Sequence, residues 1–198
     1  MKHLLPSLGL ALFFCSTSGI ALEIPKDQAV ERAEEAAHRF HKMMKSHVKS
    51  RFKESGMISA ARFCAEESHR EIEKLNRELG PDISLKRISL ENRNPDAYPL
   101  DSEADIIRAF ELMESSNAYL PEQIVQMIDE TTYKVYLPAT MSSKNCKKCH
   151  GKEEEMDPEV RKYVQEHYPK DRATGFRSGQ VRGAVVVTVR IHDNNQPQ

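Results

Sequence analysis

Five consecutive residues carry the clearest chemistry in the chain: Cys146, Lys147, Lys148, Cys149 and His150. This Cys-x-x-Cys-His pattern is the attachment signature for c-type haem. Its spacing lets both thiols add across the vinyl groups at one edge of a porphyrin, and the adjacent imidazole can bind the iron from the proximal side. The pattern therefore predicts one covalent heme c, held by Cys146 and Cys149, with His150 as an axial iron ligand.

Other kinds of site share part of this pattern. A thioredoxin-like redox pair needs a strand–helix–strand setting, and none is apparent around Cys146 and Cys149. A zinc site usually needs a second Cys-x-x-Cys pair, which the sequence lacks. A simple disulfide stays open as an alternative. Haem attachment is the favoured interpretation provided that the chain is exported.

The first 21 residues have the pattern of a secretory signal peptide. Lys2 precedes an apolar stretch from Leu4 to Phe14, and Gly19-Ile20-Ala21 supplies small residues where a signal peptidase cleaves. We therefore expect a periplasmic protein that begins near residue 22. An uncleaved N-terminal membrane anchor is the alternative, because the apolar stretch is nearly long enough to span a bilayer.

Cleavage after Ala21 leaves 177 of the 198 residues, the size of one ordinary domain. We place that domain at 22–192 and a disordered polar tail at 193–198. Lys and Arg then number 28 against 30 Asp and Glu. This slightly negative balance argues against nucleic acid or an anionic membrane as a partner. Aromatic residues make up only 7% of the chain, so its core would gain from a large apolar cofactor.

The apolar spacing predicts helices and strands in an order typical of an α+β protein. Gly56 interrupts the first helical pattern, and the continuous apolar run at Val185–Val187 predicts a central strand. We expect a small antiparallel sheet with helices packed around it. The expected elements are a helix at 26–55, a helix at 58–79, a strand at 83–90, a helix at 102–113, a short helix or strand at 123–128, a strand at 131–137 ended by Pro138, a helix at 158–167 and a strand at 181–191.

The chain resembles a family of periplasmic c-type haem domains known as DUF3365, whose fold is PAS-like. The resemblance covers most of the mature chain, and Arg-Asn-Pro together with the later haem motif makes it fairly specific. It is carried by the helix with Cys64, Arg87-Ile88-Ser89, Arg93-Asn94-Pro95, Glu103, the Cys146–Gly151 motif, the Asp171 and Gly175 loop, and Gly183-Ala184.

The resemblance implies a haem iron with a histidine on one side and a cysteine thiolate on the other. Carried over, these residues are His150 and Cys64. Sequence alone leaves Cys64 evenly divided between an iron ligand and a buried structural thiol, since free cysteine packs as a small apolar residue. The rival ligands are Met141, Met156, His38, His41, His47, His69 and His167.

Arg87 and Arg93 are candidates to bind the haem propionates, because a guanidinium matches the geometry of a carboxylate. Both could equally be ordinary surface arginines.

The resemblance implies a redox or gas sensor that passes a conformational change to a partner protein or to a homodimer formed through the long first helix. A soluble electron-transfer cytochrome is the alternative. We do not expect an enzyme, because two protein ligands would block the open iron position that an enzyme such as a peroxidase needs.

Overall fold

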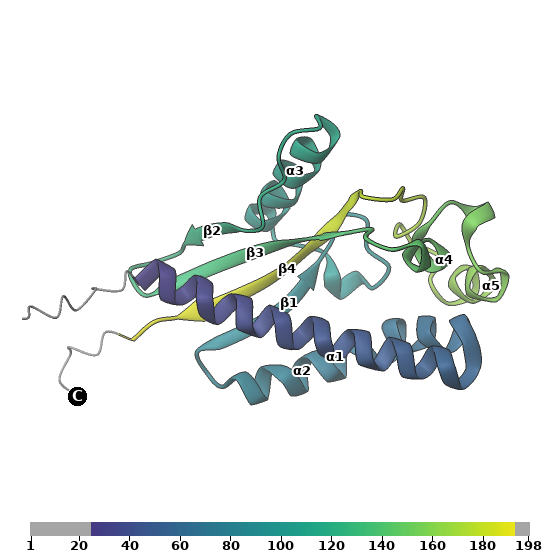
Figure 1. The fold of residues 1–198 in the computed structure, drawn as a ribbon, viewed down its shortest axis with the longest axis horizontal. Helices are drawn as coiled ribbons and strands as arrows, with labels where there is room; N and C mark the ends of the chain where they lie inside the picture. Colours follow the sequence, from purple (N-terminus) through teal and green to yellow (C-terminus); the bar gives the residue numbers. More distant parts are fainter. Residues whose placement is uncertain (1–24, 193–198) are drawn as a thin grey trace, which may run out of the picture.

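The computed structural model describes residues 25–192, so the expected signal peptide and C-terminal tail lie outside the described residues. Its elements confirm the expected α+β class (Figure 1). Along the chain they are α1 (Pro25–Arg62), the π-helical turn η1 (Phe63–Glu67), α2 (Ser68–Leu79), β1 (Ile83–Ile88), η2 (Pro95–Ala97), α3 (Asp101–Ser115), β2 (Ile124–Met127), β3 (Thr132–Thr140), η3 (Lys144–Cys146), α4 (Lys147–His150), η4 (Glu153–Glu155), α5 (Pro158–His167) and β4 (Val181–Arg190).

The four strands form one antiparallel sheet in the order β1-β4-β3-β2. β4 therefore lies between two partners, as its apolar run predicted. Alternate residues of a strand point to opposite faces of the sheet. Accordingly, Val185 and Val187 pack on one face, whereas Ala184 and Val186 pack on the other.

Helices cover both faces of the sheet (Figure 1). On one face, α1 presents a row of small residues and Phe40, and α2 adds Leu75. The small side chains let α1 lie close against β4 and β3, since their backbones can approach without steric conflict. On the other face, α3 buries Ile107 and Phe110 against Tyr136. The sheet is therefore packed between two helical layers.

The first helical segment changes direction where Gly56 predicted a break. Ser55 has φ −151° and ψ 29°, and Gly56 has φ 75°. A positive φ is strained for residues with a Cβ, so glycine permits this turn. The chain then continues helically into η1, whose π-helical turn carries Cys64. π-helical turns inside helices are frequent at functional sites.

One expected boundary was wrong, because β3 does not end at Pro138. This proline lies inside the strand, opposite Ala184 of β4. β2 pairs with β3 only at Tyr133–Tyr136, so nothing in the sheet needs the N–H that Pro138 lacks. The segment at 123–128, left open between helix and strand, forms β2.

A third apolar cluster lies beyond the end of the sheet where β3 ends and β4 begins (Figure 1). It joins the end of α1, at Ala61, to α5, at Val160 and Tyr163, and Cys149 packs against it. The cluster fixes the Cys-x-x-Cys-His segment against the helix that leads to Cys64. Among the described helices, none is both long enough and apolar enough to cross a membrane.

Candidate functional site

The Cys-x-x-Cys-His motif folds as a single helical turn. Cys146 ends η3 and caps α4, which contains Cys149 and His150. Residues three apart on a helix are neighbours on its surface, so the two thiols lie on one side of this turn. Gly151 follows with its backbone tight against the turn. A Cβ there would lie 2.7 Å from the Lys147 carbonyl oxygen.

The ring of His150 is held by the loop that precedes β4. Its Nδ1 lies 2.7 Å from the Ala173 carbonyl oxygen. A carbonyl oxygen only accepts, so Nδ1 carries the hydrogen and Nε2 keeps its lone pair. Metal-binding histidines commonly donate their other ring nitrogen to a carbonyl in this way. The bond thus sets the tautomer that can bind a metal through Nε2.

The same loop is fastened to the motif by its backbone. Phe176 N–H donates to the His150 carbonyl at 3.0 Å, and Gly175 N–H donates to the Gly151 carbonyl at 2.8 Å. Burial, helped by the positive charges of Arg182 and Arg93, holds the pKa of His150 well below its usual range. The imidazole is therefore neutral near pH 7, the form that binds metals.

Cys64 lies on the helical segment that follows the turn at Gly56. Its η1 turn is fixed by the Ser68 hydroxyl, which donates to the Cys64 carbonyl at 2.7 Å. Burial raises the pKa of Cys64, and the nearby guanidinium groups of Arg87, Arg182 and Arg93 oppose that rise.

Ala65, the residue after Cys64, packs against the same apolar cluster as Cys149. Burial, followed by the charge of Cys64, raises the pKa of Cys149 to about 11. The helical segment with Cys64 therefore lies in the same part of the fold as the motif, although 81 residues separate Cys64 from Cys146, and the role of Cys64 as an iron ligand stays a prediction.

Arg93 is bonded to protein groups. Its Nε lies 3.0 Å from Oδ1 of Asp171, and an Nη lies 2.8 Å from the Cys149 carbonyl oxygen. Both side chains of this ion pair are nearly buried. Arg93 therefore joins the motif backbone to the loop that holds His150.

Arg87 lies on β1 and donates from Nη2 to the Ser68 hydroxyl at 2.9 Å. The same Ser68 hydroxyl donates its own hydrogen bond to the Cys64 carbonyl oxygen. Arg87 therefore supports the turn that carries Cys64, and among the described residues it has no carboxylate within ion-pair distance.

Sequence reasoning missed Arg182, which belongs to the same cluster. Its Nε is buried and has no hydrogen-bond partner among the described residues. Burial, followed by the charges of Arg87 and Arg93, lowers the pKa of Arg182 to about 10. A signal was present in the sequence, since Arg182 is a charged residue at the start of the most apolar strand.

Two of the rival ligands, both methionines, lie near the motif. Met156 is buried in the cluster that Cys149 contacts, and Met141 is buried where β3 leads into the motif. Two of the rival histidines have other contacts. His47 stacks on Phe63 and pairs with Glu71. His167 bonds to the Tyr163 carbonyl oxygen through Nδ1 at 2.9 Å.

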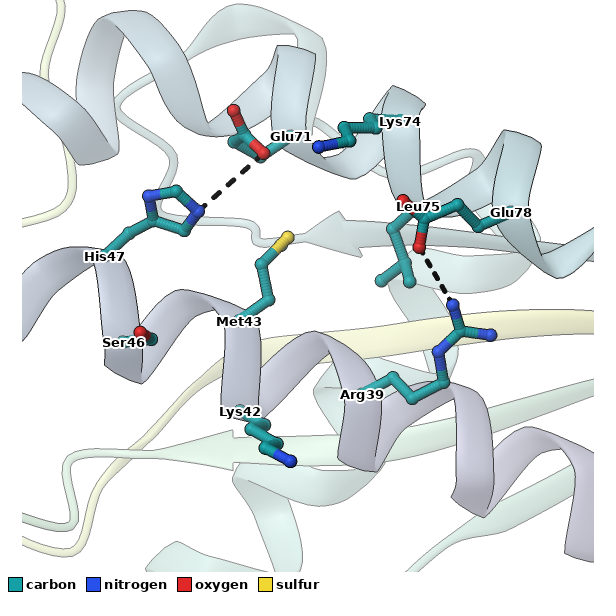
Figure 2. Close-up of a pocket in the computed structure, with 9 residues that line it drawn as sticks. All are labelled: Arg39, Lys42, Met43, Ser46, His47, Glu71, Lys74, Leu75 and Glu78. Atoms are coloured by element: carbon teal, nitrogen blue, oxygen red, sulfur yellow. Dashed lines mark hydrogen bonds and ion pairs between the residues drawn. The ribbon is translucent and has the colours of Figure 1, made fainter.

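A groove of about 440 Å³ runs between α1 and α2. Figure 2 shows His47 directed toward Glu71 and Arg39 toward Glu78, with Met43 between the two helices. Two pairs, Arg39–Glu78 and His47–Glu71, cross the groove, and of the predicted ligands only the rival candidate His47 lines it. The groove is thus separate from the Cys-x-x-Cys-His cluster.

The structure also bears on the disulfide and zinc interpretations of the motif. Cys64, Cys146 and Cys149 are unpaired in the structure. Within residues 25–192, no group of three or more His, Cys, Asp or Glu side chains is placed to hold a bare metal ion. The arrangement instead offers two thiols on one helical turn, a neutral imidazole with a free Nε2, a third thiol and a cluster of arginines. This set can hold a metal-containing cofactor that brings its own equatorial ligands and carries acidic groups.

Comparison with known proteins agrees with the resemblance seen in the sequence. Among curated proteins, none matches the chain. The solved structure of the cyanobacterial heme-protein Tll0287 matches with a TM-score of 0.60 and 18% identity, covering 83% of this chain and 96% of that chain. At this identity the match shows the fold. The family model Tll0287-like matches residues 25–190, so the chain belongs to the Tll0287-like family.

Proposed function

We propose that the chain is an exported mono-haem c-type cytochrome-like protein that acts as a redox or gas sensor. In this proposal Cys146 and Cys149 form the thioether bonds to one heme c, and His150 binds the iron. The similar solved structure is that of a heme-protein, which supports a haem ligand. When bound, the haem would supply an iron centre that can change oxidation state.

One observation carries the proposal. The 2.7 Å contact between His150 Nδ1 and the Ala173 carbonyl oxygen directs the lone pair of Nε2 away from that carbonyl. A histidine in a simple disulfide loop needs no such fixed tautomer, whereas an iron ligand does. The lowered pKa of His150 supports the same role, because a protonated imidazole cannot bind iron.

Cys64 is proposed as the second axial ligand. It shares the surroundings of Cys149, and its turn is held by Ser68 and Arg87. Binding to iron would keep the thiol deprotonated despite its burial. With both axial positions filled by protein, the site would bind a cofactor without catalysing a reaction, so we propose that the chain is not an enzyme.

The position of Cys64 favours sensing. Cys64 lies in η1, on the helical segment that follows the turn at Gly56 and packs back along α1 through Arg51–Glu67 and His47–Glu71. Release of the thiolate on reduction or gas binding would therefore act on a segment packed against a long helix, α1, which runs along the sheet (Figure 1). That helix could pass the change to a signalling protein or to a second copy of the chain.

An electron-transfer role is the second candidate. Cys146 is partly exposed, and the adjacent Lys144 and Lys148 are exposed. One edge of a haem attached there would face solvent and a redox partner. An electron carrier, unlike a sensor, should keep both axial ligands when the iron is reduced.

Purification of the full chain from a periplasmic extract tests the proposal. Acid–acetone extraction should leave the haem on the polypeptide, and N-terminal sequencing should begin near residue 22. Colour that leaves with the solvent would refute covalent attachment. Carbon monoxide added to the reduced protein separates the two roles, because only a sensor should exchange its thiolate for the gas.

A further inference from the structure

Two arginines beside the predicted haem site lack a counter-charge. Arg87 donates only to the Ser68 hydroxyl, and Arg182 has a buried Nε without a partner. The carboxylate of Asp171 accepts hydrogen bonds from Arg93 at both oxygens, so Asp171 pairs with Arg93 and with neither of these two arginines. Within residues 25–192, neither Arg87 nor Arg182 forms an ion pair.

The backbone forces this pair of charges together. Gly183, with φ 146°, packs its Cα against the Ile88 carbonyl oxygen and the Ser89 backbone, where any Cβ would collide. The Ser89 hydroxyl then donates to the Arg182 carbonyl at 2.6 Å. The end of β1 and the start of β4 therefore meet closely, which places Arg182 beside Arg87.

Like charges held together away from water are unfavourable unless an anion compensates them. Burial, and next the charge of Arg87, lowers the pKa of Arg182 to about 10. A planar guanidinium pairs best with a carboxylate or phosphate, to which it donates two parallel hydrogen bonds. The site is therefore suited to a ligand that brings its own acidic groups.

We propose that Arg182, together with Arg87, binds the propionate carboxylates of the haem, and that Arg93 instead positions the Cys149 backbone. This inference rests on the proposed function, since it names the groups that hold the acidic edge of the same cofactor. Haem carries two propionates, and the structure offers two arginines that no carboxylate of residues 25–192 neutralises.

The thiolate of Cys64 is the competing anion, because both arginines also act on its pKa. Resonance Raman spectroscopy of the haem-loaded full chain separates the two. The propionate-bending band of the wild type should lie at the position of hydrogen-bonded propionates. It should shift toward that of solvent-exposed propionates in Arg182→Gln, and further in Arg182→Gln with Arg87→Gln.

Arg190→Gln is the matched control, because Arg190 lies on the same strand and is exposed. Arg182→Lys keeps the charge but loses the paired donors, so it should also shift the band if the first variant does not accumulate. A wild-type band at the solvent-exposed position would overturn the inference. So would an unshifted band in either Arg182 variant, or a change in the thiolate signals alone. Haem missing from the wild type after acid–acetone extraction would instead refute the proposed function.

Discussion

The guanidinium of Arg93 bonds to the backbone of Cys149 across 56 residues of sequence, with an N···O distance of 2.8 Å. The same side chain pairs with Asp171 at 3.0 Å. Asp171 in turn accepts from the N–H of Ala173, whose carbonyl oxygen holds the His150 ring. Arg93 and Asp171 therefore support both the thiol and the imidazole of the motif.

Breaking this pair should destabilise the chain and reduce haem loading. In Asp171→Asn, a nearly buried Arg93 loses its counter-charge, which typically costs about 3 kcal/mol of unfolding free energy. Urea unfolding measures that loss, and the haem-to-protein ratio measures loading. Arg172→Gln is the control, since Arg172 pairs with Glu91 at the surface and should contribute at most about 1 kcal/mol. Equal effects in the two variants would contradict the proposed role of the pair.

Replacing the Cys64 thiol should change the iron without unfolding the chain. A thiolate is anionic and stabilises ferric over ferrous iron, so Cys64→Ser should raise the reduction potential and remove the thiolate-type low-spin signal from the ferric EPR spectrum. Ala65→Ser, which adds a hydroxyl at the next position and keeps the thiol, should leave both unchanged. An identical EPR spectrum in Cys64→Ser would make Cys64 a packing residue and return attention to Met141 and Met156.

The sequence predicted the framework of the site but only part of its support. The helices that match their expected positions, such as α5, have strong apolar periodicity and a clear starting signal in Asp157 and Pro158. β3 was predicted too short because a proline usually ends a strand, and its tolerance at Pro138 depends on how far β2 extends. Only the three-dimensional pairing of strands reveals this.

The site shows the same division. The Cys-x-x-Cys-His motif is local, so its chemistry could be predicted from spacing. Arg182 and the Ala173 carbonyl act through contacts made by folding, and a backbone carbonyl has no sequence signature at all. Cys64 was assigned from the family resemblance, and its place near the cluster that Cys149 contacts depends on how the segment around Ala61 and Ala65 packs in three dimensions.

Glu103 predicts a pH dependence of stability away from the predicted haem site. Its side chain is fully buried, and its carboxylate pairs with Lys86 and Lys134, each at 2.8 Å. Burial alone would raise the pKa of Glu103, but the hydrogen bonds from Lys134 and Lys86 outweigh it and hold the pKa below its usual value. The ionised carboxylate therefore stabilises the fold.

Because the folded pKa is the lower one, this contribution should be complete above the unfolded value and disappear as the pH falls through the folded value. Glu103→Gln should cost about 2 kcal/mol at pH 7, and the difference from wild type should shrink below about pH 4.5. Denaturant unfolding across that range measures it. Asp105→Asn, which removes an exposed pair with Arg108, is the control and should show a far smaller difference at pH 7. A pH-independent cost for Glu103→Gln would refute the ionised pair.

Tyr163 joins the two halves of the predicted iron site. Its hydroxyl donates to the Glu66 carboxylate on η1, two residues after Cys64, while its own helix, α5, follows the motif. The Tyr163 ring is buried in the apolar cluster, and the guanidinium carbon of Arg62 lies over it, 5.2 Å from the ring centroid. Tyr163→Phe should therefore keep the packing and remove only the hydrogen bond that restrains the Cys64 turn.

A less restrained turn should let Cys64 leave the reduced iron more often. The lost bond is worth about 1 kcal/mol, which corresponds to roughly a fivefold larger population with the thiol released. Carbon monoxide binding to the reduced protein, followed by stopped-flow absorbance, should be faster by about that factor. Tyr119→Phe, at an exposed position, should bind carbon monoxide at the wild-type rate. An unchanged rate in Tyr163→Phe, with Cys64→Ser still accelerating binding, would show that the Glu66 contact does not control release of Cys64.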